Sequence, residues 1–177
     1  MVLRIAQLGQ PVLRQRAAEV SPDEIHAPEF QRLIDDMLET MRGAEGAGLA
    51  GPQVFAGRRI FIALIRPPVE GEERAPEVFI NPRIVGISRE QAAAWEGCLS
   101  FMELMVLVTR PLAVRVEYFD RHGQPHSLDL QDFPARVVQH EYDHLEGILT
   151  IDRAATSLDI VKTSEMEAVR EARGEKE

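Results

Sequence analysis

The sequence of 177 residues is poor in several features that mark particular classes of protein. Its single cysteine, Cys98, excludes a scaffold built on intramolecular disulfides and fits a reducing compartment. No apolar run approaches the ~20 residues that cross a bilayer. The short apolar start is interrupted by Arg4 and lacks the pattern of a secretory signal. These absences predict a cytoplasmic protein with no membrane-spanning segment.

Basic residues are also scarce relative to acidic ones. The chain has 20 Lys and Arg against 29 Asp and Glu, which gives a formal net charge of −9. This excess disfavours nucleic acid or an anionic membrane as the main partner, so we predict no direct binding to either. The hydrophobic content of 45% is too high for a disordered chain, and the length suits one core. Residues 1–177 are therefore expected to form a single domain.

Two helices are indicated by apolar spacing and by residues that start and end helices. An apolar stripe predicts a helix that follows Pro28 and is ended by Gly43. A second helix is expected to start near Pro134, with Asp132 as its cap and Gly147 at its end. Both carry one apolar face, so both are expected to pack against other elements.

The two ends of the chain are predicted from weaker patterns. Pro11–Arg14 is typical of an extended N-terminal arm. A C-terminal helix is expected over about 157–172, with Leu158 facing inward, followed by a frayed charged tail over 173–177. Each of these assignments depends on local pattern alone.

The middle of the chain is typical of strands joined by loops. A glycine-rich loop is expected over 46–53 and a solvated acidic loop over 70–74. The alternation over 112–119, the turn that follows and residues 127–130 predict a hairpin. Hairpin-linked strands with few helices favour an α+β fold with antiparallel sheets. The remaining predicted strands lie at 60–65, 78–80 and 84–85.

The residues His140-Glu141-Tyr142-Asp143-His144 match the pattern His-Glu-x-x-His. Residues four apart share one face of a helix, so both imidazoles can reach one metal ion. Neutral imidazole suits zinc or ferrous iron. Glu141 follows the first histidine and can reach a metal-activated water without binding the metal itself, so it is the expected general base and acid.

A catalytic metal usually takes three protein ligands, and the motif supplies two. No histidine follows His144, which leaves Asp152, Asp159 and Cys98 as candidates for the third. A lone cysteine is often only a small buried hydrophobe. However, Cys98 follows Gly97, which permits close backbone approach, and a metal-bound thiolate is a strong ligand.

Three segments, taken together and in this order, resemble the peptide deformylase family. They are the glycine-rich segment 46–53, Glu-Gly-Cys-Leu-Ser at 96–100, and Gln-His-Glu-x-Asp-His within 139–147. The resemblance covers most of residues 1 to about 152. It extends to Pro11-Val12-Leu13-Arg14, Ile80-Asn81-Pro82, Arg110-Pro111 and Ala135-Arg136-Val137-Val138.

The resemblance implies a fold and a metal centre. The family's fold is α+β, with antiparallel sheets around a central helix that carries the two histidines. Cys98, His140 and His144 would bind one divalent metal, which in the family is ferrous iron natively and often zinc or nickel in preparations. Glu141 would act as the general base and acid.

The resemblance also implies the substrate side of the site. The Gln53 amide and the Leu99 backbone N–H would stabilise the developing oxyanion, and Gly48 would let the peptide approach the loop. Glu96 and Arg110 would form an ion pair that supports the cysteine segment. The residues expected on this side are Gly46, Gly48, Val137, Glu96 and Arg110.

The family removes the formyl group from N-formylmethionyl peptides of nascent proteins and releases formate. The implied partners are these peptides and, transiently, the ribosome, with the protein a monomer or a weak dimer. One alternative is a related metallo-amidase or peptidase on the same scaffold. A second is a non-catalytic, metal-stabilised module, but such a site needs neither Glu141 nor Gln53.

Two departures from the family pattern stand out. The family usually continues after Glu-Gly-Cys-Leu-Ser with Val-Pro-Gly, whereas this chain has the apolar segment 101–108. We expect this segment either to change peptide preference or to bury itself against another subunit. Gly51 stands where the family usually has Ala, and is expected to loosen the oxyanion loop slightly.

Overall fold

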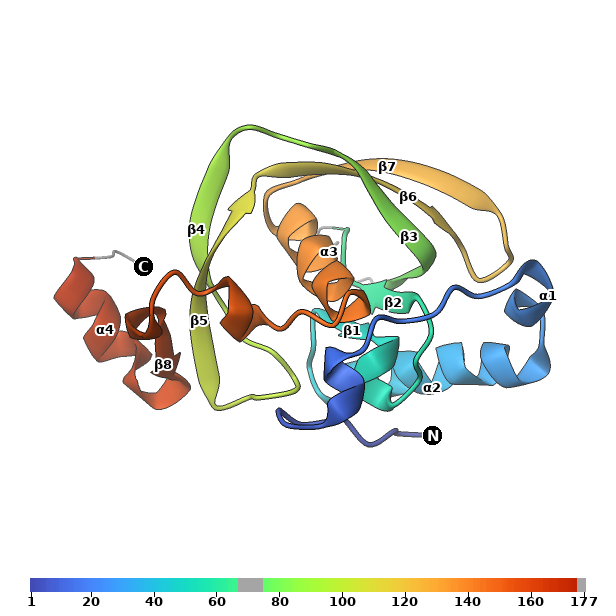
Figure 1. Ribbon diagram of the computed structural model, residues 1–177, viewed down its shortest axis with the longest axis horizontal. Helices are drawn as coiled ribbons and strands as arrows, with labels where there is room; N and C mark the ends of the chain where they lie inside the picture. Colours follow the sequence, from blue (N-terminus) through green and yellow to red (C-terminus); the bar gives the residue numbers. More distant parts are fainter. Residues whose placement is uncertain (67–74, 175–177) are drawn as a thin grey trace.

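Two antiparallel sheets and the helix between them make up the body of the protein, in a computed structural model that describes residues 1–66 and 75–174. The larger sheet has the strand order β1-β2-β3-β6-β7 and the smaller one β4-β5-β8. Figure 1 shows both sheets arching over the helix α3 (Asp132–Leu145). The expected α+β architecture around a central helix is therefore confirmed. The strands of the larger sheet are β1 (Gly48–Ala50), β2 (Ile60–Ala63), β3 (Glu77–Ile87), β6 (Ala113–Phe119) and β7 (Pro125–Gln131).

The helix α3 packs one face against the larger sheet. Its buried residues include Ala135, Val138 and Leu145, which join Phe61 and Phe79 of the sheet in one hydrophobic cluster. Full burial of such side chains contributes about 1.5–3 kcal/mol each, so this packing anchors the helix firmly. The anchored helix carries residues 140–144, and it ends near Gly147 as expected.

The predicted helix after Pro28 is confirmed as α2 (Pro28–Gly43). Its buried stripe of Phe30, Ile34 and Met37 packs beneath β1 and β2 in a second hydrophobic cluster. A short helix α1 (Pro22–Ile25), which the sequence pattern did not indicate, precedes it and is capped by the Ser21 side chain. None of the helices in the described ranges is long and apolar enough to cross a membrane.

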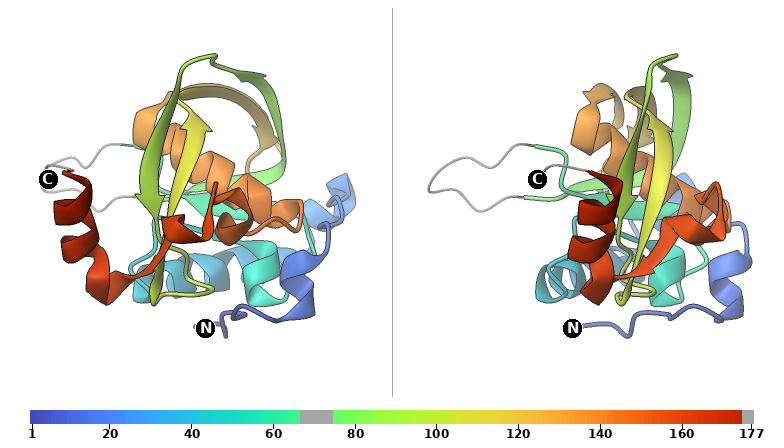
Figure 2. Two further views of the ribbon diagram at one scale, coloured as in Figure 1. Left: turned by 60° about the vertical axis from the view of Figure 1, so that its left-hand side comes forward. Right: turned by 90° about the vertical axis from the view of Figure 1, so that its left-hand side faces the viewer.

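The smaller sheet consists of β4 (Gln91–Glu96), β5 (Leu104–Pro111) and β8 (Ile160–Lys162). Figures 1 and 2 show α4 (Met166–Arg173) on the outer side of this sheet, away from α3. The strand β5 lies between β4 and β8, while β4 is an edge strand. The residues that follow β4 lie beside α3, since the Cys98 Sγ is 3.4 Å from His144 Nε2.

The C-terminal helix starts later than predicted: the prediction was about 157–172, and α4 begins at Met166. Residues 157–159 form the 3₁₀ turn η4, β8 follows, and residues 163–165 form η5 before α4 starts at Met166. The strand forms because the β-branched Ile160 and Val161 pair with β5. Leu158, expected to face inward, is 76% exposed. Arg173, expected in a frayed tail, is the last residue of α4, and 175–177 lie outside the described residues.

Several shorter predictions are also wrong. Pro11–Arg14 forms a 3₁₀ turn, η1, rather than an extended arm. The glycine-rich segment 46–53 is not all loop, because its apolar centre pairs with β2 as strand β1 and the 3₁₀ turn η2 (Gly51–Val54) follows. Asp132 does not act as the N-cap of α3; it lies at φ +54° and Gln131 occupies the cap position.

The strands predicted at 78–80 and 84–85 are one strand, β3, with an irregular register at Asn81 and Pro82. The predicted strands at 60–65 and 112–119 and the hairpin into β7 are confirmed. The acidic loop predicted for 70–74 lies outside the described residues.

The apolar segment 101–108 is mostly buried within its own chain. Phe101, Val106 and Val108 belong to a third hydrophobic cluster, and the segment enters the central strand of the smaller sheet. Among its apolar residues only Met102 is largely exposed, at 63%. The chain's own core thus covers Phe101, Val106 and Val108, and burial of the rest of the segment against another subunit stays a prediction.

Candidate active site

Cys98, His140 and His144 lie together in the structure. One ligand atom from each residue lies within 4.8 Å of the others, and the Cys98 Sγ is 3.4 Å from His144 Nε2. The two histidines are one turn apart on α3, and Cys98 follows the end of β4. The structure thus selects Cys98 over Asp152 and Asp159 as the third candidate ligand.

The two buried histidines have different electrostatic surroundings. Burial alone would lower the pKa of His140, but its contacts with Cys98 and Glu96 outweigh this effect and raise the pKa well above its usual range. The His140 Nδ1 is 3.0 Å from Glu96 Oε2, and because a carboxylate only accepts hydrogen bonds, Nδ1 is the donor and Nε2 is the atom that a metal would bind after losing its proton. Burial, and then the charges of His140 and Arg110, hold the pKa of His144 well below its usual range. Once deprotonated at the binding atoms, two imidazoles and one cysteine sulfur form a donor set for zinc, ferrous iron or similar ions.

Glu141 is a buried carboxylate without the usual partners. The residue is 4% exposed, and its Oε2 has no hydrogen-bond partner among the described residues. Burial, offset by the nearby charge of His140, raises the pKa of Glu141 from 4.5 to about 7. An unpaired buried oxygen next to three metal-ligand atoms indicates a group that meets a bound species rather than a structural partner.

Gly48 lies directly against Glu141. A Cβ at position 48 would lie 2.7 Å from the Glu141 Cδ, which is closer than real contacts allow. Besides its predicted role in the approach of a peptide, there is thus a second reason for a glycine at position 48. The absence of a side chain at Gly48 makes room for the carboxylate.

Gln53 is held in one orientation next to Cys98. It is 1% exposed, and its Oε1 accepts a hydrogen bond of 2.8 Å from the Ala50 backbone N–H. This bond turns the Nε2 toward Ser100 Oγ at 3.2 Å and Cys98 Sγ at 3.6 Å. The amide donor therefore faces the cluster of candidate ligands.

The turn before Gln53 is tightly enclosed. A Cβ at Gly51 would lie 2.7 Å from the Arg58 carbonyl oxygen, so the backbone here is too close to residue 58 for a side chain. The expectation that Gly51 loosens this loop is not supported, because the glycine permits a close approach instead.

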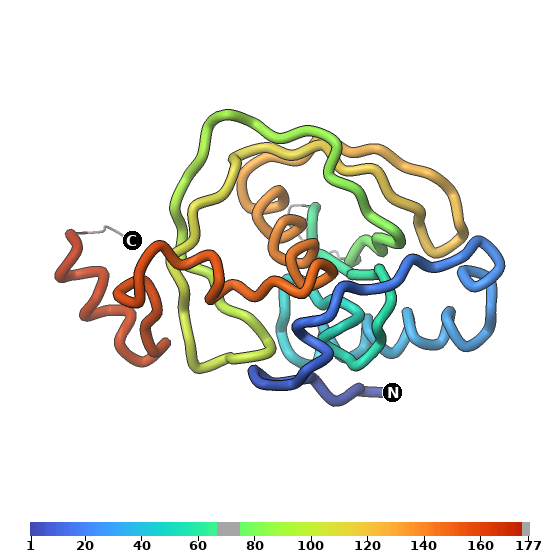
Figure 3. Tube along the Cα trace, viewed as in Figure 1, coloured from blue at the N-terminus to red at the C-terminus, as the bar shows by residue number. Residues whose placement is uncertain are grey.

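The N-terminal segment joins the two loops that face the cluster. The trace in Figure 3 shows it running beside the loop that follows β4. The Ala6 N–H donates to the Gln53 carbonyl at 2.7 Å, and the Leu8 N–H donates to the Ser100 carbonyl at 2.9 Å. These bonds fix the Gln53 and Leu99 segments relative to each other.

A cavity of about 590 Å³ opens in front of the cluster. Of the residues expected on the substrate side, Arg110 is the exception: it lines a smaller cavity behind the cluster. It therefore supports the site from behind rather than facing a substrate. The other expected residues that line the larger cavity are Gly46, Gly48, Gln53, Glu96, Leu99, Val137 and Glu141.

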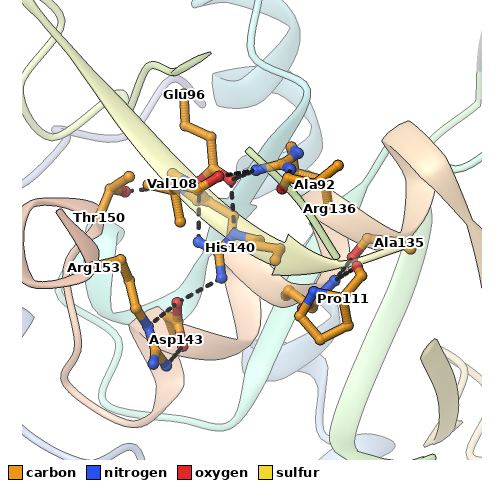
Figure 4. Close-up of polar contacts among 12 residues, drawn as sticks. Ala92, Glu96, Val108, Pro111, Ala135, Arg136, His140, Asp143, Thr150 and Arg153 are labelled. Carbon is orange, nitrogen blue, oxygen red and sulfur yellow. Dashed lines mark hydrogen bonds and ion pairs between the residues drawn. The ribbon is translucent and has the colours of Figure 1, made fainter. Parts of the chain in front are cut away.

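The expected ion pair of Glu96 and Arg110 is confirmed and belongs to a larger network (Figure 4). Arg110 Nε and Nη2 donate to the two Glu96 oxygens at 2.7 and 3.0 Å. Burial alone would raise the pKa of Glu96, but the hydrogen bonds from His140 and Arg110 outweigh it and lower the pKa from 4.5 to about 2. Glu96 is therefore ionised at neutral pH, with its carboxylate beside His140 Nδ1.

Two members of this network were missed by sequence reasoning. Arg136 donates to Glu96 Oε1 at 2.7 Å, and Asp143 accepts from Arg110 Nη1 at 2.9 Å. Asp143 lies inside the His-Glu-x-x-His pattern, so its position three residues after His140 was an available signal. Arg136 lies four residues before His140, on the same helical face, which was a second available signal.

Comparison with known proteins agrees with this geometry. Residues 2–159 match the family model described as polypeptide deformylase. Peptide deformylase 2 of Nostoc sp. is 46% identical over 167 residues, covering 93% of this chain and 92% of that protein. A peptide deformylase of Rhizobium meliloti is 43% identical over 145 residues, covering 82% of this chain and 80% of that protein.

Solved structures of peptide deformylases also resemble this chain. A class I type b peptide deformylase from Acinetobacter baumannii superposes with a TM-score of 0.80 at 38% identity, covering 86% of this chain and 99% of that one. Peptide deformylase from Thermotoga maritima superposes with a TM-score of 0.79 at 38% identity, covering 88% and 99%. Together with the cluster of Cys98, His140 and His144, these matches show that the chain belongs to the polypeptide deformylase family of metal-dependent hydrolases.

Proposed function

We propose that this enzyme removes the formyl group from N-formylmethionyl peptides with Glu141 as the general base and acid. The single observation that carries this assignment is the buried Glu141 carboxylate, whose Oε2 has no partner in the described residues beside the three candidate metal ligands. A similar structure from Acinetobacter baumannii, with a TM-score of 0.80 at 38% identity, was solved with Met-Ala-Ser bound. A peptide that begins with methionine is consistent with the proposed substrate.

Cys98, His140 and His144 would hold one divalent metal ion. Such an ion supplies a Lewis acid that lowers the pKa of water toward ~7. One thiolate and two imidazoles accept ferrous iron, zinc or nickel. We propose ferrous iron as the native metal, as the family pattern implies.

Glu141 would move the protons of the reaction. Its carboxylate takes a proton from the attacking water, and the protonated acid then delivers one to the nitrogen of the departing amine. A carboxyl group with a pKa of about 7 populates both forms near neutral pH, which suits a group that must act as base and then as acid.

Gln53 and Leu99 would stabilise the oxygen that becomes negative during the reaction. The Gln53 Nε2 is already oriented toward the cluster by its bond to Ala50, so it needs no reorganisation when charge develops. The backbone N–H of Leu99 would be the second donor. One such donor is typically worth ~10²–10³ in rate.

The cavity would receive the peptide. Val137, Phe133 and Met102 line it and offer an apolar surface to the methionine side chain. Gly46 and Gly48 also line it and present backbone rather than side chains. Met102 belongs to the divergent segment 101–108 and lines the cavity, so it is the residue by which this segment would change peptide preference.

We further propose that the protein acts in the cytoplasm on chains emerging from the ribosome. Its net charge of −9 does not favour a lasting contact with the polyanionic ribosome, so the encounter would be transient. The buried state of most of segment 101–108 removes the main reason to expect subunit association, which is consistent with a monomer or a weak dimer.

The first test is an assay of the metal-loaded enzyme. Protein purified without oxygen and loaded with ferrous iron or nickel is expected to release formate from formyl-Met-Ala-Ser and no acetate from acetyl-Met-Ala-Ser. An absence of formate would overturn the proposal. Cleavage after the methionine residue, without formate, would support the alternative of a peptidase on this scaffold.

A second test addresses the ligand set. Replacing Cys98 by Ala removes the thiolate and is expected to abolish metal retention, as measured by elemental analysis after dialysis. A matched substitution at the exposed Ser157 should retain the metal. Unchanged metal content in the Cys98→Ala protein would remove this residue from the proposed ligands.

A further inference from the structure

Arg136 lies at the junction of three elements behind the metal centre. It is on α3, four residues before His140, and its side chain is 14% exposed. Its Nη1 donates to Glu96 Oε1 at 2.7 Å and to the Val108 carbonyl of β5 at 2.9 Å. Its Nη2 donates to the Ala92 carbonyl of β4 at 2.7 Å, as Figure 4 shows. One side chain thus ties α3 to two of the three strands of the smaller sheet, β4 and β5.

The Glu96 carboxylate receives four hydrogen bonds in a fixed pattern. Its Oε1 accepts from Arg110 Nε and Arg136 Nη1, and its Oε2 accepts from Arg110 Nη2 and lies 3.0 Å from His140 Nδ1. Arg110 donates to both oxygens, but one guanidinium alone still allows the carboxylate to rotate relative to it. Arg136 adds a second, independent direction and so fixes where Oε2 lies for His140.

From this geometry we infer that Arg136 is a positioning residue for the metal centre, acting through Glu96 on the orientation of His140. The inference rests on the proposed role of His140 as a metal ligand. Groups that hydrogen-bond a ligating imidazole fix its ring orientation and its tautomer, and losing them typically weakens metal binding by ~10–100-fold.

A lysine at position 136 would not reproduce this arrangement. The three acceptors lie on β4, on β5 and on the Glu96 side chain, and the planar guanidinium reaches them with two nitrogens at fixed angles. A lysine ammonium is a single point on a flexible stem and cannot span the same set. The Arg136→Lys protein keeps the charge and is therefore the variant that separates charge from geometry.

The experiment measures cobalt(II) binding by competition with a chelator, together with the visible absorption of the cobalt-loaded protein. Arg136→Met, which acts one step beyond Glu96, is expected to weaken cobalt binding by up to ~10-fold and to shift the absorption bands. Arg136→Lys should give a smaller loss in the same direction. Arg115→Met is the matched control: Arg115 is 57% exposed and pairs with Asp129 on the far edge of the larger sheet, so this variant should bind cobalt as the unaltered protein does.

A double-mutant comparison tests the route through Glu96. If Arg136 acts through Glu96, adding Arg136→Met to Glu96→Gln should cause little further loss of cobalt affinity. Fully additive losses would overturn the inference, as would an Arg136→Met protein with unaltered affinity and spectrum. If Arg136→Met does not fold, the Arg136→Lys protein decides the question alone. Failure of the unaltered protein to bind cobalt would instead count against the proposed metal site itself.

Discussion

Two buried glutamates next to His140 have opposite surroundings. Glu96, behind the imidazole, is 7% exposed and receives hydrogen bonds from two arginines and from His140. Glu141 is 4% exposed, and its Oε2 has no partner among residues 1–66 and 75–174. The two residues are equally buried, yet the pKa of Glu96 falls to about 2 while that of Glu141 rises to about 7.

The difference shows that contacts, rather than burial, decide what a carboxylate does in this protein. Burial raises the pKa of both groups, and only Glu96 has enough donors to reverse the effect. Glu96 is therefore suited to hold a ligand in place, and Glu141 is suited to exchange protons. Pairs of carboxyl groups whose pKa values are driven apart in this way often divide structural and acid–base roles.

The largest expected effect comes from removing the reactive member of the pair. Replacing Glu141 by Gln keeps the size of the side chain but removes the proton acceptor. We expect kcat for formyl-Met-Ala-Ser to fall by ~10²–10⁴-fold while the bound metal is retained. Turnover close to that of the unaltered enzyme would show that Glu141 is not the base.

The second effect concerns the donor on the cavity side. Replacing Gln53 by Ala removes the oriented Nε2 donor, and we expect kcat to fall by ~10²–10³-fold with little change in KM. The split between kcat and KM, measured over a range of peptide concentrations, is the diagnostic quantity. A rise in KM with kcat unchanged would instead indicate ordinary substrate binding by Gln53.

The third effect tests the space that Gly48 leaves for Glu141. Replacing Gly48 by Ala places a methyl group where the carboxylate lies, so Glu141 must move. A displacement of about 1 Å can cost ~10²-fold in rate, and we expect a loss of that order. Gly57→Ala is the matched control, because a Cβ there meets nothing within 4 Å. Equal activity of both variants would contradict the steric argument.

The smallest effect is on stability and has opposite signs for the two glutamates. Because the pKa of Glu96 is lowered from 4.5 to about 2, its ionised form stabilises the fold above pH 4.5, and this contribution is lost as the pH falls toward 2. In metal-free protein, Glu96→Gln should cost about 3 kcal/mol of unfolding free energy at pH 7 and much less near pH 2. Urea unfolding across this range measures the difference.

For Glu141, the same unfolding experiment is expected to show the opposite dependence of stability on pH. Its raised pKa means that the protonated form stabilises the fold at low pH, and that this contribution is lost as the pH rises through about 7. Glu141→Gln should therefore be more stable than the unaltered metal-free protein at pH 8 and similar to it at pH 4. Changes of the same sign for both variants would contradict the comparison between the two groups.

Much of the fold was predictable where the pattern is local. The apolar stripe of α2 and the alternation in β6 depend only on the residues of each element, and both predictions are confirmed. The predicted helix over about 157–172 is wrong because Ile160 and Val161 pair with β5, far away in the sequence. The burial of Phe101, Val106 and Val108 of segment 101–108 was not predictable for a related reason, since the core that covers them comes from other segments.

The candidate site divides in the same way. The spacing of His140, Glu141 and His144 by itself determined two candidate ligands and a candidate base, because positions on one helix have fixed geometry. Only the tertiary structure placed Cys98, 46 residues before His144, within reach of both imidazoles. It also decided that Glu96 has four donors and that Glu141 Oε2 has none in the described chain. Burial and hydrogen bonding depend on elements brought together by packing, and these set the two pKa values in opposite directions.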